Sequence, residues 1–123
     1  MVDPIELREA DIATYTVKRG DTAPVVADTL LDSSGNAVNL TGSTVKFHMS
    51  TWDLQTVVIN GNATGPNGGS PDNTGQVQYQ WQSADTTTAG VYRGEWQVTF
   101  AGGGVETWPD AGYAVVSIPS DLV

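Results

Sequence analysis

Hydrophobic and polar residues alternate along several short stretches of the chain. In VYRGEWQVTF, residues 91–100, alternate positions from Tyr92 to Phe100 carry aromatic residues, Val or Gly and fall on one face, and Arg93 and Glu95 fall on the other. This period of two is the pattern of a strand with one buried face. The segments 76–81 and 44–49 repeat it. The buried positions that these strands predict are Val45, Phe47, Val77, Tyr79, Trp81, Trp96, Val98 and Phe100.

Four further runs are rich in β-branched and aromatic residues and are bounded by Gly, Pro, Asn or Asp, as strands usually are. No stretch shows a sustained helical period. About seven short strands with frequent turns favour an all-β fold, an immunoglobulin-like β-sandwich over residues 13–123, preceded by a short amino-terminal arm over residues 1–12. A small closed barrel is the alternative. The further runs are 13–18, 24–32, 56–60 and 113–118.

Several predicted turns depend on glycine. Gly20 and Asp21 follow Arg19, and the resulting Arg-Gly-Asp tripeptide is known as an adhesion signal. Here it lies where the chain must reverse between two strands, so we interpret it as a turn. Gly35 and Gly103 suit the tips of hairpins, because glycine accepts a positive φ. We therefore expect these glycines to be structural turn residues.

The start of the strand at 91–100 carries a further signal. Gly90 ends the preceding turn, and Tyr92 follows two residues later. This order resembles a tyrosine corner, in which the phenol hydroxyl bonds to backbone a few residues upstream and fixes the crossing between two sheets. The stretch 62–75 consists almost entirely of turn-forming residues, so we expect a long surface loop with a mobile tip.

Composition narrows the classes of partner. The 123 residues include five Lys or Arg and fourteen Asp or Glu, for a net charge of −9. This charge repels nucleic-acid backbones and anionic membranes. There is no Cys, which excludes disulfides and thiolate metal sites. The acidic start, and the lack of an apolar run near ~20 residues, predict neither a classical export signal nor a membrane span.

Candidate chemistry is sparse. His48 is the one histidine, and the alternation of its segment places it on the solvent face with Lys46. Asp32, Ser34 and Asn36 have the spacing of a calcium loop, but the Gly and the final Glu that such a loop needs are missing. We therefore expect no catalytic residue, no metal site and no cofactor, and we predict that the protein is not an enzyme.

Two tryptophans lie outside the alternating runs. Trp52 precedes Asp53, and Trp108 precedes Pro109. An exposed Trp beside a carboxylate can stack on sugar rings, so a carbohydrate-binding module with a host glycan as ligand is one hypothesis. Burial at the ends of the sandwich, or a protein interface, is favoured over it. The candidate interface residues are Ile5, Leu7, Ile12, Trp52 and Trp108.

The order of these features along the chain matches a known pattern. The run VKRGDTAPVVADTLLDSSGNAVNLTGSTVKFHM, residues 17–49, is followed after a variable loop by GQVQYQWQSADTTTAGVYRGEWQVTFAGGGVETWP, residues 75–109. Taken together, and over about residues 15–122, these segments resemble the amino-terminal immunoglobulin-like domain of phage baseplate upper proteins.

The resemblance implies a structural protein of a tailed-phage particle, a baseplate or tail scaffold or adaptor that binds neighbouring virion proteins and supports host attachment. Such a protein is assembled in the bacterial cytoplasm, becomes part of the virion, and is present in several copies or as a homo-oligomer. The sequence ends at Val123 without the coiled coil of that family. The alternative we expect is therefore a capsid or neck decoration protein that stabilises the particle.

Overall fold

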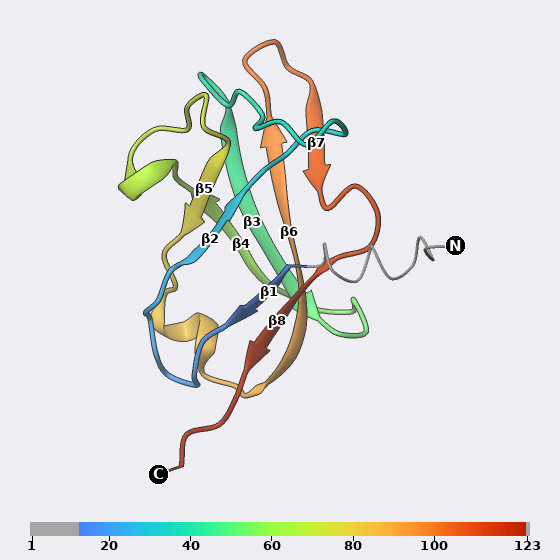
Figure 1. Ribbon diagram of the computed structural model, residues 1–123. Coiled ribbons are helices and arrows are strands. Elements are labelled where there is room, and N and C mark those ends of the chain that lie inside the picture. Colours follow the sequence, from blue (N-terminus) through green and yellow to red (C-terminus); the bar gives the residue numbers. More distant parts are fainter. Residues whose placement is uncertain (1–12, 123) are drawn as a thin grey trace, which may run out of the picture.

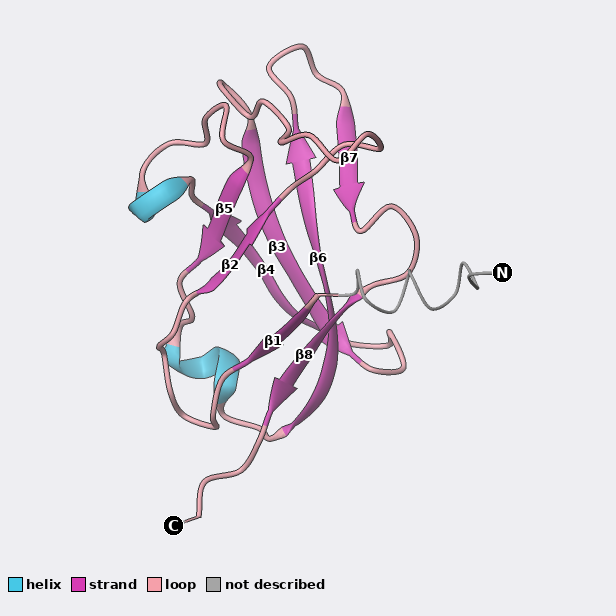
Figure 2. Cartoon of the chain, in the orientation of Figure 1, coloured by secondary structure: helices cyan, strands magenta, loops and turns pink. Residues whose placement is uncertain are grey.

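The computed structural model describes residues 13–122, so Ile5, Leu7 and Ile12 of the arm lie outside the described residues. Two β-sheets pack face to face as an immunoglobulin-like sandwich, which confirms the predicted all-β fold class (Figures 1 and 2). In the described range no helix is long and apolar enough to cross a membrane. The elements are β1 (Thr14–Thr16), β2 (Val26–Thr29), β3 (Thr44–Thr51), β4 (Val57–Ala63), β5 (Gln76–Tyr79), β6 (Gly90–Thr99), β7 (Val105–Trp108), β8 (Ala114–Ile118), and two short 3-10 helices, Pro66–Gly68 and Ser83–Thr86.

β6 is the central strand of the larger sheet, whose order is β1-β8-β6-β3-β4 (Figure 1). β3 lies along one edge of β6, with Phe47 opposite Trp96. Along the other edge, β8 pairs with the first half of β6 and β7 pairs with the second half. β1 runs parallel to β8, and the other pairs are antiparallel. β4, β1 and β7 therefore each have one side that pairs with no strand of this sheet.

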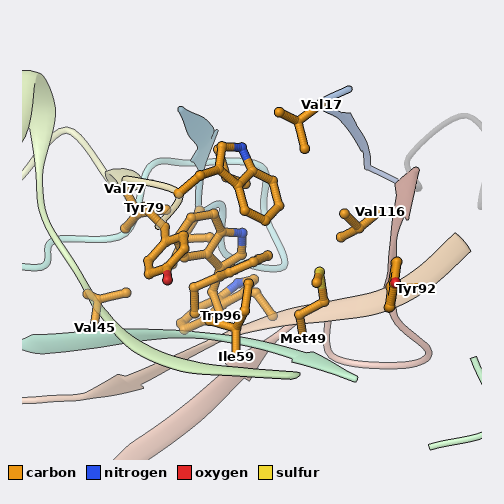
Figure 3. Packing of buried hydrophobic residues seen from close by; sticks show 14 of the residues in the cluster. Val17, Val45, Met49, Ile59, Val77, Tyr79, Tyr92, Trp96 and Val116 are labelled. Atoms are coloured by element: carbon orange, nitrogen blue, oxygen red, sulfur yellow. The ribbon is translucent and has the colours of Figure 1, made fainter. Parts of the chain in front are cut away.

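β2 and β5 form the smaller sheet, which is antiparallel and has Val26 opposite Tyr79. A bridge between Thr64, just after β4, and Gln78 in β5 links the two sheets. The apolar faces of the sheets enclose the core (Figure 3).

Alternation decides which side chains enter this core. Every second residue of β3 from Val45 to Met49 is buried, and the residues between them are half-buried on the outer face. Phe47 and Trp96 meet at the centre, with ring centroids 4.8 Å apart. A glycine, Gly94, precedes Trp96 on the inner face of β6, because a Cβ there would lie 3.2 Å from the Phe47 ring. Buried members of the predicted core are Val45, Phe47, Val77, Tyr79, Trp81, Trp96 and Val98.

Phe100 differs from the prediction, and Trp108 takes one of its two predicted alternatives. Phe100 comes after the last residue of β6 and is only half-buried, because the sheet no longer covers it. Its ring contacts Trp108 edge-on, with centroids 6.4 Å apart. For Trp108, burial and an interface are the two predicted alternatives, and the structure shows burial: Trp108 is 9% exposed and its Nε1–H donates to the Leu31 carbonyl at 2.9 Å. Trp108 belongs to the core because it lies opposite Trp96 on the inner face.

Tyr92 is buried, and its hydroxyl donates to the Thr88 carbonyl 2.6 Å away. A bond to backbone four residues upstream is the geometry of a tyrosine corner. Gly90, in contrast, is not a turn residue. It is the first residue of β6 and pairs with Ile118, because β8 is long enough to continue the ladder to that point.

Gly20, Gly35 and Gly103 lie in turns, with φ values of 84°, 84° and 96°. The Gly20 N–H donates to the Thr86 carbonyl, and the buried Thr86 hydroxyl donates to the Asp21 carbonyl at 2.9 Å. Hydrogen bonds therefore connect the Arg-Gly-Asp tripeptide to the 3-10 helix that precedes β6.

The stretch 62–75 does not project as one long free loop. β4 continues into it, and Thr64 and Gln78 each donate an N–H to the carbonyl of the other. Further along, the Leu40 N–H donates to the Asp72 carbonyl at 2.9 Å. Backbone hydrogen bonds that the turn-rich composition does not reveal therefore attach both ends of this stretch to the sandwich.

A chain of side-chain hydrogen bonds crosses the interior between the sheets. The Trp96 Nε1–H donates to the Tyr15 hydroxyl at 2.9 Å, and that hydroxyl donates to Asp28. Burial of the phenol, followed by its bond to Asp28, raises the pKa of Tyr15 above its usual value. Similarly, the Tyr79 hydroxyl donates to Asp85 at 2.7 Å, and burial together with this bond raises the pKa of Tyr79.

Candidate interaction surface

The larger sheet is low in net charge. Its strands contain two basic and two acidic residues, whereas the whole chain has a net charge of −9. The remaining carboxylates of residues 13–122 lie in turns, in connections and in the smaller sheet. A macromolecular partner that is itself acidic therefore meets least repulsion at the larger sheet. The four charged residues are Lys46, Arg93, Glu95 and Glu106.

Arg93, on the outer face of β6, is held between two aromatic side chains. Its guanidinium carbon lies 4.4 Å from the centroid of the Trp52 ring and 5.5 Å from that of Tyr113. Aromatic faces attract a cation at such distances. Trp52 and Tyr113 are nevertheless 49% and 38% exposed. Together with the exposed Leu54 and Val57, these three residues form what we call the aromatic–arginine patch.

A hollow of about 290 Å³ lies within this patch and is also lined by His48 and Glu95. His48 Nδ1 is 3.3 Å from Glu95 Oε2. His48 lies on the outer face as predicted, but it is not surrounded by solvent alone, because Glu95 lies directly opposite it on β6. This pair is the one contact within 4 Å between a basic side chain and a carboxylate among residues 13–122, so the guanidinium of Arg93 has no carboxylate partner in that range.

The turn between β3 and β4 positions Trp52 and Leu54. The Thr51 hydroxyl donates to Asp53 Oδ1 at 2.6 Å, and the Gln55 N–H donates to the same oxygen at 3.0 Å. These two bonds hold the pKa of Asp53 below its usual value. The carboxylate beside Trp52 is thus used to shape the turn that presents the indole.

A second hollow, of about 570 Å³, opens between β2 and the β7–β8 connection and is lined by Asp28, Asp32 and Asp110. Asp32 Oδ1 accepts the N–H groups of Ser34 and Asn36, each at 2.9 Å. The calcium-like spacing therefore forms a backbone turn. In the part of the chain that the structure describes, no three His, Cys, Asp or Glu residues are grouped to hold a metal ion.

Side chains around His48 are not arranged for nucleophilic catalysis. Ser50 lines the same hollow, but its hydroxyl donates to the Thr51 carbonyl at 3.1 Å. His48 is engaged with Glu95. Activation of a serine requires a hydrogen bond between its hydroxyl and the base. Ser50 and His48 are therefore not joined as a nucleophile and its base.

Comparisons with known proteins bear on the fold alone. No family model and no curated protein matches the chain. The structure is similar to that of CopC from Methylosinus trichosporium OB3b. This likeness has a TM-score of 0.52 at 14% sequence identity, and it covers 93% of this chain and 91% of the CopC chain. At such identity the likeness shows a shared β-sandwich fold and says nothing about a shared site.

Sequence reasoning names Trp52 as a candidate interface residue but misses Arg93 and Tyr113. Arg93 counts only as a polar position of an alternating strand, and nothing in the sequence shows which aromatic residues flank it. The sequence carries one indication of an exposed apolar surface on this side of β6. Val91 is apolar although it lies on the polar side of the strand, and it is 51% exposed.

Proposed function

We propose that this protein is a non-enzymatic structural subunit of a tailed-phage particle, and that it binds a neighbouring virion protein through the aromatic–arginine patch. The phage assignment comes from the resemblance of residues 15–122 to the baseplate upper protein domain. The binding role comes from one observation, the position of Arg93 between two exposed aromatic rings on a sheet with no net charge.

The composition of the patch supports protein binding. Trp, Tyr and Arg are the residue types that dominate binding energy at protein interfaces. The contacts of the Arg93 guanidinium with the Trp52 and Tyr113 rings orient it in advance, so less side-chain entropy is lost when a partner binds. Its N–H groups, which have no carboxylate partner within residues 13–122, suit a carboxylate or a carbonyl oxygen of the partner.

The carbohydrate-binding alternative has weaker support. A sugar ring stacks on a bare aromatic face. One face of Trp52 is covered by Arg93, and Trp108 is buried. Asp53 uses the carboxylate beside Trp52 for its own turn. Trp108 therefore offers no open ring, and Trp52 keeps at most one open face, beside a carboxylate that is already hydrogen-bonded within its turn.

Incorporation into particles tests the proposal. Particles assembled with the Arg93→Ala or Trp52→Ala chain are purified on a density gradient, and the bound chain is quantified by immunoblot. We expect a loss of roughly tenfold or more, since truncating a central interface residue costs about 2 kcal/mol or more. Arg19→Ala is the matched control, because Arg19 is exposed and lies outside the patch.

Normal incorporation of both patch variants would contradict the binding role, and absence of the wild-type chain from particles would contradict the virion role. Tails and heads separated on the same gradient distinguish a tail or baseplate subunit from a capsid decoration protein. Retention of the wild-type chain on host polysaccharide, with loss in Trp52→Ala, would instead favour the carbohydrate-binding module.

A further inference from the structure

β4 is an open edge of the larger sheet. It pairs with β3 on one side. On the other side, the bridge between Thr64 and Gln78 lies just beyond the end of β4, and among residues 13–122 it is the one backbone pairing on that side. The backbone groups along that side of β4 therefore have no strand partner among the described residues. Such an edge is a template for a strand from another chain.

Thr64 shows which backbone groups face the open edge. Its N–H and C=O both bond to Gln78, so they point away from β3. Because these directions alternate along a strand, the N–H and C=O of Asn60 and Asn62 point the same way. Nearer to Val57, the register of β4 with β3 shifts, so the alternation from Thr64 does not extend to that end of the strand. Asn60 and Asn62 thus give the edge two donors and two acceptors.

The β4 edge lacks the residues that normally prevent strand addition. Edge strands are usually protected by Lys, by Pro or by other charges. Residues 54–71 contain no charged side chain, although the chain as a whole has a net charge of −9. Val57 and Val58 are 71% and 36% exposed at the start of this strand. Two copies repel each other wherever their carboxylates meet, so this uncharged stretch lets a second copy approach most closely.

We propose that two copies of the chain pair through their β4 edges as antiparallel strands, with Asn60 of one copy opposite Asn62 of the other. This register places a twofold axis at Gly61 and forms four main-chain hydrogen bonds. Gly61 brings no side chain to this axis, and packing within the chain accounts for the glycine, because a Cβ there would lie 2.5 Å from the Tyr79 ring. The two larger sheets then become one continuous sheet.

The axis of such a pair stands perpendicular to the sheet, so both outer faces lie on the same side. The two aromatic–arginine patches therefore point in one direction, and an assembly that repeats its binding site can engage both at once. Linking two modest contacts in this way raises the overall affinity without any new contact. The pairing itself does not depend on which protein the patch binds.

Single-cysteine variants test the register, because the chain has no Cys of its own. In the proposed pair, the Cα atoms of residues 60 and 62 from different copies lie about 5.5 Å apart, which is within disulfide reach. Two copies of residue 60 are offset along the strands and lie beyond the ~7 Å limit. A mixture of Asn60→Cys and Asn62→Cys should therefore crosslink roughly tenfold faster than either variant alone. Asn36→Cys mixed with Asn62→Cys is the control, since Asn36 lies in an exposed turn.

Light scattering of the full chain at high micromolar concentration gives an independent readout. We expect a dimer, which Asn60→Lys converts to a monomer while Asn36→Lys does not, because a lysine at the edge of β4 blocks strand addition. A wild-type chain that stays monomeric at every concentration overturns the proposal. Crosslinking in the control mixture, or by Asn60→Cys alone, that is as fast as in the proposed mixture overturns it as well.

Discussion

Replacing Tyr15 by Phe removes the middle of the hydrogen-bonded chain that joins the two sheets. The Trp96 Nε1–H donates to the Tyr15 hydroxyl at 2.9 Å, and Trp96 is only 1% exposed. Without the hydroxyl, the indole N–H has no acceptor among residues 13–122, while Asp28 loses the phenol as a donor. The ring itself remains, so its edge-on contacts with Phe47 and Trp96 are kept.

The expected cost follows from these contacts. A buried donor left without a partner costs about 1–3 kcal/mol. Since Tyr15 is half-buried and Asp28 can be rehydrated, the loss of the second hydrogen bond adds little. We therefore expect Tyr15→Phe to lower the free energy of unfolding by about 2 kcal/mol at neutral pH. For a domain of this size, that corresponds to a fall in Tm of roughly 6–12 °C.

The effect of Tyr15→Phe should depend on pH. A tyrosine whose pKa is raised in the folded state keeps its proton where the unfolded chain has already lost it, so the folded state is penalised as pH rises. The contribution of each such tyrosine to the free energy of unfolding is fully present below about pH 10. Above that pH it declines by about 1.4 kcal/mol per pH unit. Tyr15 and Tyr79 both contribute in the wild type, and Tyr79 alone contributes in the variant. The difference between variant and wild type should therefore narrow above about pH 10.

Urea unfolding, followed by tryptophan fluorescence and repeated from neutral to alkaline pH, measures the loss in free energy of unfolding at neutral pH and the change of that loss with pH. Tyr113→Phe is the matched control, because Tyr113 is 38% exposed and its hydroxyl forms no hydrogen bond with residues 13–122. A loss for Tyr15→Phe below about 0.5 kcal/mol would show that the interior hydrogen bonds are not stabilising. A difference that stays constant above pH 10 would contradict the pKa argument even if the neutral-pH value holds.

Three further substitutions test features of the turns. Tyr92→Phe removes the bond to the Thr88 carbonyl and should cost about 1 kcal/mol in urea unfolding, whereas an unchanged midpoint would mean that the corner adds no stability. Gly20→Ala should cost about 1 kcal/mol, because φ is +84° there although the space around a Cβ is open. Arg19→Ala should stay within about 0.5 kcal/mol of wild type, and a larger loss would show that the tripeptide is more than a turn.

The strands that sequence predicts best are those whose alternation is complete. β6 and β3 follow the period of two over most of their length, so their inward residues, such as Trp96 and Phe47, can be identified without a structure. β7 is harder, because four residues show little alternation and only the pairing with β6 defines it. For the same reason the sequence leaves burial and an interface open for Trp108, since its position opposite Trp96 appears only once the strands are paired.

The aromatic–arginine patch could not be predicted because its members meet only in three dimensions. Arg93 comes from a strand, Trp52 from the β3–β4 turn and Tyr113 from the residue before β8. The sequence shows that Arg93 points outward, but the position of the indole depends on the hydrogen bonds of Asp53 within its turn. Local periodicity carries no information about which loop reaches which strand.

The distribution of charge connects the two proposed contacts. The strands of the larger sheet have no net charge, and the uncharged run from 54 to 71 adjoins them at β4, while the excess of carboxylates lies elsewhere in the chain. Repulsion between copies is therefore expected to be weakest where an outer sheet face or the β4 edge is presented. Pairing at the edge places two Arg93 side chains on one side of a continuous sheet, so each patch needs only a modest affinity for its partner. A chain with a large net negative charge can in this way assemble in one orientation and stay dispersed in all others.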